Sequence, residues 1–110
     1  MLRFKPGVKL SGLQPQMALA ATVVLSAYTA AGYPSVWVTS ANDSKHKPDS
    51  FHYKGYALDF RLNDASGIPP VDRPKVAALV KSALGAEFDV LHESPGTPNE
   101  HLHVEYDPKG

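Results

Sequence analysis

The sequence predicts a small α+β domain in which an antiparallel sheet packs against two main helices. Three observations lead to this expectation. The chain has 110 residues, a length that fits one domain spanning 1–110. Segments 15–32 and 72–84 carry apolar residues in patterns typical of helices, and four shorter segments have the alternation or β-branched content of strands. Their order, helix–strand–strand–helix–strand–strand, is typical of an α+β fold.

Composition excludes several classes of protein. The chain carries 11 Lys and Arg against 11 Asp and Glu, it has no cysteine, and 43% of its residues are hydrophobic. A net charge of zero argues against a general nucleic-acid binder, which needs a basic patch to neutralise phosphates. The absence of cysteine excludes a disulfide scaffold and thiolate chemistry. The hydrophobic content is that of a folded domain rather than a disordered chain.

The N-terminal residues 1–14 contain one proline and two glycines, and we expect them to form an irregular arm. The arm is basic, but no apolar signal-peptide region follows it directly, so we expect synthesis in the cytoplasm without a signal peptide. The most apolar stretch, 17–31, is shorter than the roughly 20 residues that a bilayer requires. We interpret it as a buried helix, and we expect no membrane insertion.

The first helix is expected to begin near Pro15, which suits a first helical turn, and to end at Gly32. A β-rich run at 36–39 predicts the first strand. Residues 40–55 are polar and predict a long loop, and loops of that length in compact domains are commonly functional. Residues 56–62 then alternate as a strand, with Leu, Phe and Leu on the core face and Asp59 on the other face.

The second half of the chain predicts one helix and two strands. Residues 72–84 form an amphipathic pattern that ends at Gly85. A strand at 88–92 follows, then a turn segment rich in Pro and Gly, and then a last strand at 101–106. In that last strand apolar residues alternate with His101, His103 and Glu105, so these three polar residues share the face opposite the core.

Histidine and carboxylate side chains therefore converge from one loop and two strands. His52 lies at the edge of the long loop, Asp59 lies on the next strand, and two histidines lie on the last one. Imidazole nitrogens and carboxylate oxygens are ligands of Zn²⁺, and three such ligands leave a fourth position for water. Glu100 is the nearest acid to serve as general base. A domain without metal, in which the histidines are incidental, is the simpler alternative.

Two motifs carry a resemblance to a known family. Residues 50–59, Ser-Phe-His-Tyr-Lys-Gly-Tyr-Ala-Leu-Asp, resemble the S-x-H-x-x-G-x-A-x-D signature of the M15 family of zinc peptidases. Residues 100–103, Glu-His-Leu-His, resemble its second motif, an acid three residues before the last zinc ligand. The family includes D-Ala-D-Ala carboxypeptidases and phage L-alanyl-D-glutamate endolysins, and this compact chain is most similar to phage-encoded members. Both motifs also resemble the zinc site of hedgehog signalling domains.

The resemblance implies a hedgehog/DD-peptidase-like fold and one zinc ion. It implies that His52, Asp59 and His103 bind the zinc. It further implies that Glu100 activates a water and that His101 lines the site and helps to hold the oxyanion. The implied reaction is hydrolysis of a peptide bond in peptidoglycan stem peptides or cross-links, at the bacterial cell wall. A non-catalytic zinc-containing module of the same fold, which binds the cell wall or a protein, is the alternative.

The sequence departs from the family where many members have an arginine that holds the substrate. The corresponding stretch, 39–45, contains no arginine. Lys45, Arg61, Tyr53 and His92 are therefore the candidates for substrate contacts, although a lysine does not reproduce the two-pronged grip of a guanidinium. The sequence leaves open which peptide bond is cut and which oligomeric state the protein adopts.

Overall fold

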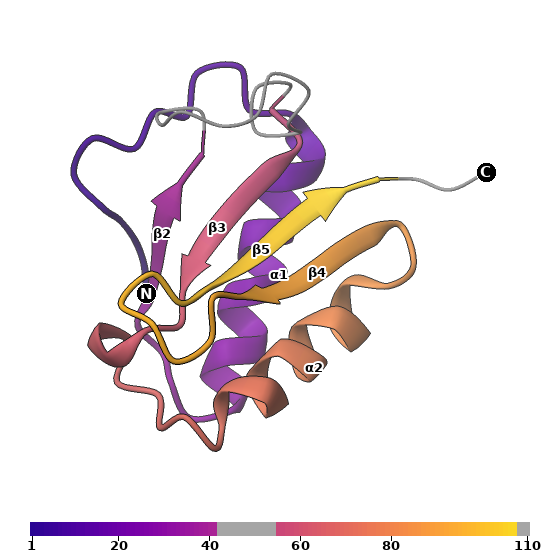
Figure 1. Ribbon diagram of the computed structural model, residues 1–110. Coiled ribbons are helices and arrows are strands. Elements are labelled where there is room, and N and C mark those ends of the chain that lie inside the picture. The colour runs from indigo at the N-terminus through magenta and orange to yellow at the C-terminus, as the bar shows by residue number, and fades with distance from the viewer. Residues whose placement is uncertain (42–54, 108–110) are drawn as a thin grey trace.

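The computed structural model describes residues 1–41 and 55–107 and has two layers, a five-stranded sheet and a pair of helices on one of its faces (Figure 1). The strands are β1 (Leu2–Phe4), β2 (Val36–Ser40), β3 (Ala57–Arg61), β4 (Phe88–Glu93) and β5 (His101–Tyr106). The helices are α1 (Pro15–Ala30) and α2 (Arg73–Leu84), with a short 3-10 helix at Asp64–Ser66. The predicted α+β class with two main helices is confirmed.

The sheet has the strand order β1-β2-β3-β5-β4. Every neighbouring pair is antiparallel except β1 and β2, which run parallel. The expectation of an irregular arm over 1–14 was wrong at its start, because Leu2–Phe4 pairs with β2, with Leu2 opposite Val36. A three-residue edge strand has too little alternation to be read locally, and its pairing depends on residues more than thirty positions away.

Helix α1 packs one face onto the sheet. Its start at Pro15 and its end before Gly32, whose φ is 99°, agree with the predicted helix. The buried side chains of α1 are Met17, Ala20, Ala21, Val24, Ala27 and Tyr28. Leu19 is exposed, so α1 is buried on one side only. In the part of the chain that the structure describes, no helix is both long and apolar enough to cross a membrane.

Helix α2 starts after Asp72 and is followed by Gly85, which has a φ of 86°, close to the predicted bounds. Val76 and Val80 are its buried apolar side chains. Arg73, its first residue, is buried as well. The helical pattern of the sequence does not predict that this charged side chain is buried.

The core fixes which side chains of β3 and β5 point away from the helices. Leu58, Phe60, Leu102 and Val104 are fully buried, each contributing about 1.5–3 kcal/mol of hydrophobic stabilisation. A shift of either strand by one residue would expose this whole set, so the alternation is strongly enforced. The intervening polar side chains therefore lie on the sheet face opposite α1 and α2, here called the open face. They are Asp59, Arg61, His101, His103 and Glu105.

Candidate metal site on the open face of the sheet

Asp59 and His103 lie side by side at the centre of the open face. They are directly opposite each other across β3 and β5. Nδ1 of His103 lies 2.9 Å from Oδ1 of Asp59, and both side chains are mostly buried. The structure thus brings together two of the three residues that the resemblance implies as zinc ligands. The third, His52, lies outside the described residues, as do Lys45 and Tyr53.

Two carboxylates hold a proton on His103. Its Nε2 donates to Oε1 of Glu105 at 2.7 Å while its Nδ1 donates to Asp59. Burial alone would lower the pKa of His103, but these hydrogen bonds and the negative charges of Asp59 and Glu105 outweigh it and raise the pKa to about 9. In the metal-free protein, His103 is therefore protonated at neutral pH, and a metal ion at Nδ1 would have to replace that proton.

His101 and Glu93 complete the cluster. Nδ1 of His101 lies 2.6 Å from the carbonyl oxygen of Asn99, and because a carbonyl only accepts, this nitrogen carries a proton. Nε2 of His101 is consequently the nitrogen that faces the cluster, 3.0 Å from Oε1 of Glu93 and 3.9 Å from Oδ2 of Asp59. One ligand atom from each of Asp59, Glu93 and His101 lies within 4.8 Å of the others. We call Asp59, His103, His101 and Glu93 the candidate metal site.

The donor set of this site fits zinc. It offers two imidazoles and two carboxylates, the nitrogen and oxygen ligands that Zn²⁺ accepts in proteins without cysteine. Each imidazole is also oriented through its other ring nitrogen, His103 by Glu105 and His101 by the carbonyl of Asn99. Metal-binding histidines almost always have such a second partner.

Glu93 was missed by the sequence reasoning. The third predicted strand ends at position 92, whereas β4 extends to Glu93, which pairs with His101. The side chain of Glu93 is 44% exposed. In the sequence, Asp89 and Glu93 alternate with Val90 and His92, so the two acids are expected on one face of a strand. Only the register of β4 on β5 shows that Glu93 lies beside the histidines.

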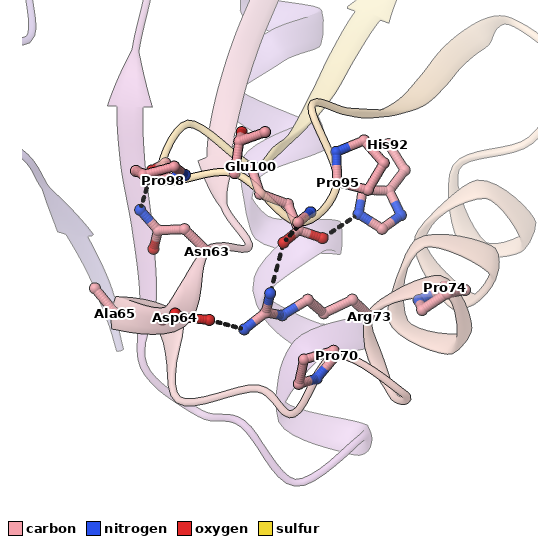
Figure 2. Close-up of a pocket in the computed structure, with 12 residues that line it drawn as sticks. Asn63, Asp64, Ala65, Pro70, Arg73, Pro74, His92, Pro95, Pro98 and Glu100 are labelled. Atoms are coloured by element: carbon pink, nitrogen blue, oxygen red, sulfur yellow. Dashed lines mark hydrogen bonds and ion pairs between the residues drawn. The ribbon is translucent and has the colours of Figure 1, made fainter.

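Glu100 lies elsewhere. Its Oε1 accepts from Nη1 of Arg73 at 2.5 Å, its Oε2 accepts from Nε2 of His92 at 2.6 Å, and the backbone N–H of Gly96 donates to Oε1 at 3.2 Å (Figure 2). Only 4% of Glu100 is exposed. The structure therefore directs the carboxylate of Glu100 to the start of α2, on the helix side of the sheet, and does not bring it to Asp59 and His103. Glu100 directly precedes β5 and lies two positions before the buried Leu102, so its side chain points to the same side of the sheet as Leu102.

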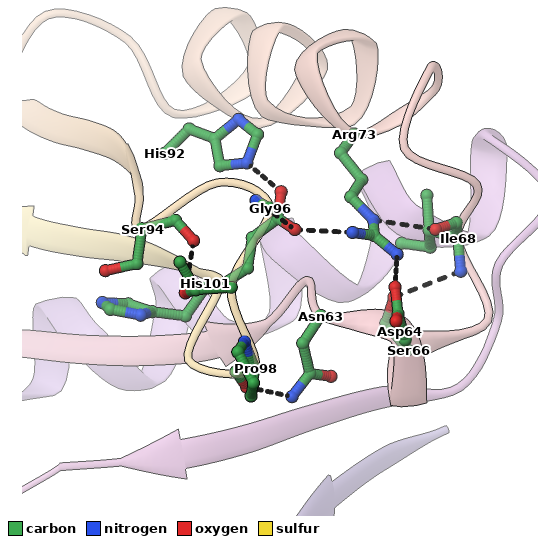
Figure 3. A network of polar contacts seen from close by, with 12 residues as sticks. Asn63, Asp64, Ser66, Ile68, Arg73, His92, Ser94, Gly96, Pro98 and His101 are labelled. Atoms are coloured by element: carbon green, nitrogen blue, oxygen red, sulfur yellow. Dashed lines mark hydrogen bonds and ion pairs between the residues drawn. The ribbon is translucent and has the colours of Figure 1, made fainter.

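Arg73 is the centre of this buried network. Its guanidinium donates to the carbonyl oxygen of Ile68 at 2.8 Å, to Glu100, and to Oδ1 of Asp64 at 3.0 Å (Figure 3). Burial alone would raise the pKa of Glu100, but the hydrogen bonds from His92, Gly96 and Arg73 and the charge of Arg73 outweigh it and lower the pKa. Glu100 is thus an ionised structural partner of Arg73.

The comparisons with known proteins add no family to this geometry. No model of a known protein family matches the chain, and no curated protein matches it. The resemblance of the two motifs stays a prediction, and function has to be argued from the site.

The two remaining substrate candidates fall in different places. His92 lines a surface pocket of about 640 Å³ between α2 and the β4–β5 turn, together with Arg73 and Glu100 (Figure 2). It therefore belongs to the buried network rather than to the candidate metal site. Arg61 lies on the open face, opposite His101 across β3 and β5. Of these two residues, only Arg61 is a neighbour of the candidate metal site.

Proposed function

We propose that this protein is a zinc-dependent peptidase that hydrolyses a peptide bond in peptidoglycan stem peptides or cross-links. The observation that supports it best is the pairing of Asp59 with His103 on the open face, flanked by His101 and Glu93. The geometry supports the metal, and the two motifs support the choice of substrate. When bound, Zn²⁺ supplies a water of lowered pKa and a Lewis acid for the substrate carbonyl.

The ligand roles follow from the hydrogen bonds around each ring. Asp59 and His103 would hold the single ion, together with His52, which the resemblance implies as the third ligand. Glu105 accepts the Nε2 proton of His103, so Nδ1, the nitrogen turned toward Asp59, is the one that would bind the ion. His101 directs Nε2 toward Asp59 and Glu93. When protonated at Nε2, it would donate a hydrogen bond to the substrate carbonyl oxygen as negative charge develops there.

The proton-transfer role is assigned to Glu93 rather than to Glu100. A general base must lie within hydrogen-bond reach of the water that it deprotonates. The carboxylate of Glu93 lies on the open face, 3.0 Å from Nε2 of His101 and 4.0 Å from Nδ1 of His103. The carboxylate of Glu100 is occupied by Arg73 and His92. Glu100 then acts by fixing the turn from which β5 starts.

Mass spectrometry of cell-wall muropeptides digested by the purified protein tests this proposal. We expect new products that disappear when a chelator removes the zinc. The Glu93→Gln variant should bind zinc and lose about 10²–10⁴-fold in rate, the range for loss of a general base. The matched Glu100→Gln variant, assayed at a temperature where it is folded, should retain more activity. Full activity in Glu93→Gln, or no products from the parent protein, would overturn the proposal.

A second candidate function is a zinc-containing module that binds the cell wall or a protein without turnover. The observation that favours it is the engagement of Glu100, since the acid of the second motif is paired with Arg73 at 2.5 Å. This function predicts that muropeptides bind intact, in the parent and in Glu93→Gln alike. Any zinc-dependent release of product excludes it.

A further inference from the structure

We propose that copies of this chain associate head to tail, with β1 of one copy pairing antiparallel with β4 of the next. These strands are the two opposite edges of the sheet, with the N-terminus at one side and β4 at the other (Figure 1). Within residues 1–41 and 55–107, β1 pairs only with β2 and β4 pairs only with β5. An edge strand presents peptide groups that can pair with another chain. The inference does not depend on the proposed function.

The peptide groups of β1 that point away from the sheet belong to its even-numbered residues. The N–H of Lys5 donates to the carbonyl oxygen of Val38 at 2.9 Å, at the end of the pairing between β1 and β2. Because the direction of the peptide groups alternates along a strand, the odd-numbered residues bond to β2. The N–H and C=O groups of Leu2 and Phe4 therefore point outward.

The same argument identifies the outward groups of β4. The carbonyl oxygen of Glu87 accepts from the N–H of Asp107 at 2.8 Å, just before the first residue of β4. The odd-numbered residues of β4 therefore bond to β5. The peptide groups of Phe88, Val90 and His92 point away from the sheet.

One antiparallel register satisfies both edges. It places Leu2 opposite Val90 and Phe4 opposite Phe88, and such pairs exchange backbone hydrogen bonds. Leu2, Phe88 and Val90 pack against the hydrophobic core, so these pairs lie on the helix side of the sheet. Phe4 is 43% exposed in the single chain and would be covered by Phe88 of the neighbouring copy. The register therefore adds apolar contacts to the hydrogen bonds.

On the open face, this register brings opposite charges together. It places Arg3 opposite Asp89 and Lys5 opposite Glu87. The guanidinium carbon of Arg3 lies 5.8 Å from the centroid of the Trp37 ring, while Lys5 and Glu87 are exposed. Opposite charges directly across two strands stabilise the pair, and like charges destabilise it. Pairing of β1 with β1, or of β4 with β4, would bring like charges together, so the charges select β1 with β4.

This contact makes the association open-ended. Each copy that pairs through one edge keeps its other edge for the next copy, and such head-to-tail contacts form filaments when they do not close into a ring. Over five strands, a twist of about 20–25° per strand rotates successive copies by about 100–125° while they advance along the sheet by about 24 Å. The contact is small, and interfaces below about 1,200 Å² are weak. Association is therefore expected at high protein concentration.

Sedimentation equilibrium of the parent protein, from about 10 μM to 1 mM in about 50 mM salt, tests the contact with and without zinc. We expect the average mass to rise with concentration past twice the 11.9 kDa of one chain. The rise should be smaller in about 0.5 M salt, because salt screens exposed charges. In NMR spectra over the same range, the amide signals of Leu2, Phe4 and Val90 should move together.

Charge variants test the register. Lys5→Glu and Glu87→Lys should each weaken association by about tenfold, because each places like charges opposite one another. Their equimolar mixture should associate as the parent does, since the altered edge of each variant then meets an opposite charge on the other. Lys9→Glu is the matched control, because Lys9 is an exposed lysine outside β1, and it should associate as the parent does. Circular dichroism checks that each variant is folded.

A parent protein that stays monomeric at about 1 mM, or a mass that levels off at two chains, would overturn the inference. Unchanged association in Lys5→Glu and Glu87→Lys would also overturn it, as would a mixture of the two folded variants that does not recover. Amide signals that move only in α1 would place the contact on the helices and exclude pairing of the edges.

Discussion

Removal of the Glu100 carboxylate should destabilise the fold far more than removal of any exposed acid. Glu100 accepts hydrogen bonds from Arg73, His92 and Gly96, and both Glu100 and Arg73 are only 4% exposed. In Glu100→Gln, the Arg73 guanidinium keeps the Ile68 carbonyl and the fully exposed Asp64 carboxylate but loses its buried counter-charge. Breaking a buried pair in this way costs about 3–5 kcal/mol. That is a large part of the roughly 5–15 kcal/mol that stabilises a domain.

Urea denaturation followed by circular dichroism measures this loss, with the slope m expected to stay unchanged. The matched control is Glu93→Gln. The side chain of Glu93 is 44% exposed, and exposed pairs contribute about 0–1 kcal/mol. The double variant Arg73→Met with Glu100→Leu should recover most of the loss, because an apolar pair of similar volume leaves no buried charge unpaired.

The pH dependence of the same variant gives an independent check. The folded protein holds the pKa of Glu100 below its ordinary value of 4.5. The stability that Glu100 contributes is therefore present above pH 4.5 and is lost as the pH falls through the folded pKa. The difference between parent and Glu100→Gln should be largest near neutral pH and shrink in acid. A loss below 1 kcal/mol at pH 7, or a difference that grows in acid, would show that the buried pair of Arg73 and Glu100 does not stabilise the fold.

Three further predictions concern the turn before β3, the protonated histidine and the metal. Gly55→Ala should destabilise the fold by about 2–4 kcal/mol in urea denaturation, because φ is 80° and a Cβ would lie 2.0 Å from the carbonyl oxygen of Gly12. Gly67→Ala, with φ of 78° but open space around it, should cost only about 1–2 kcal/mol, and equal losses would contradict the close approach. In chelator, the stability contributed by the raised pKa of His103 should be fully present below pH 6.5 and decline by up to about 3 kcal/mol as the pH rises through about 9. A flat profile from pH 6 to 10 would contradict it. Zinc at 100 times its Kd should raise the unfolding free energy by about 2.7 kcal/mol, and an unchanged Tm on zinc addition would contradict this.

Local rules were sufficient for most of the secondary structure. Pro15 and Gly32 bracket α1 because a proline suits a first helical turn and a glycine accepts the positive φ after the last. The bounds of β5 were predicted correctly from its alternation. Strand β1 was missed, because a three-residue strand is defined by its partner β2 rather than by its own pattern.

In the candidate site, too, local pattern predicts some of the residues, and tertiary structure determines the others. Alternation alone put Asp59 and His103 on one face, since a strand has only two faces and the apolar residues fill the core. Glu93 depends on how β4 registers against β5, which no local pattern states. The ion pair between Arg73 and Glu100 joins residues 27 positions apart and breaks the rule that charges stay outside. It therefore needed the structure, and it changes the role expected for Glu100.

A zinc titration of the metal-free protein by isothermal titration calorimetry, compared with Asp59→Ala and His103→Ala, tests the candidate metal site itself. We expect one zinc ion per chain in the parent and loss of that binding in both variants. Glu105→Ala, which removes both the orienting hydrogen bond to Nε2 of His103 and the negative charge beside it, should weaken zinc binding by about 10–100-fold. No zinc bound by the parent, or zinc bound equally well by Asp59→Ala, would show that Asp59 and His103 do not form a metal site.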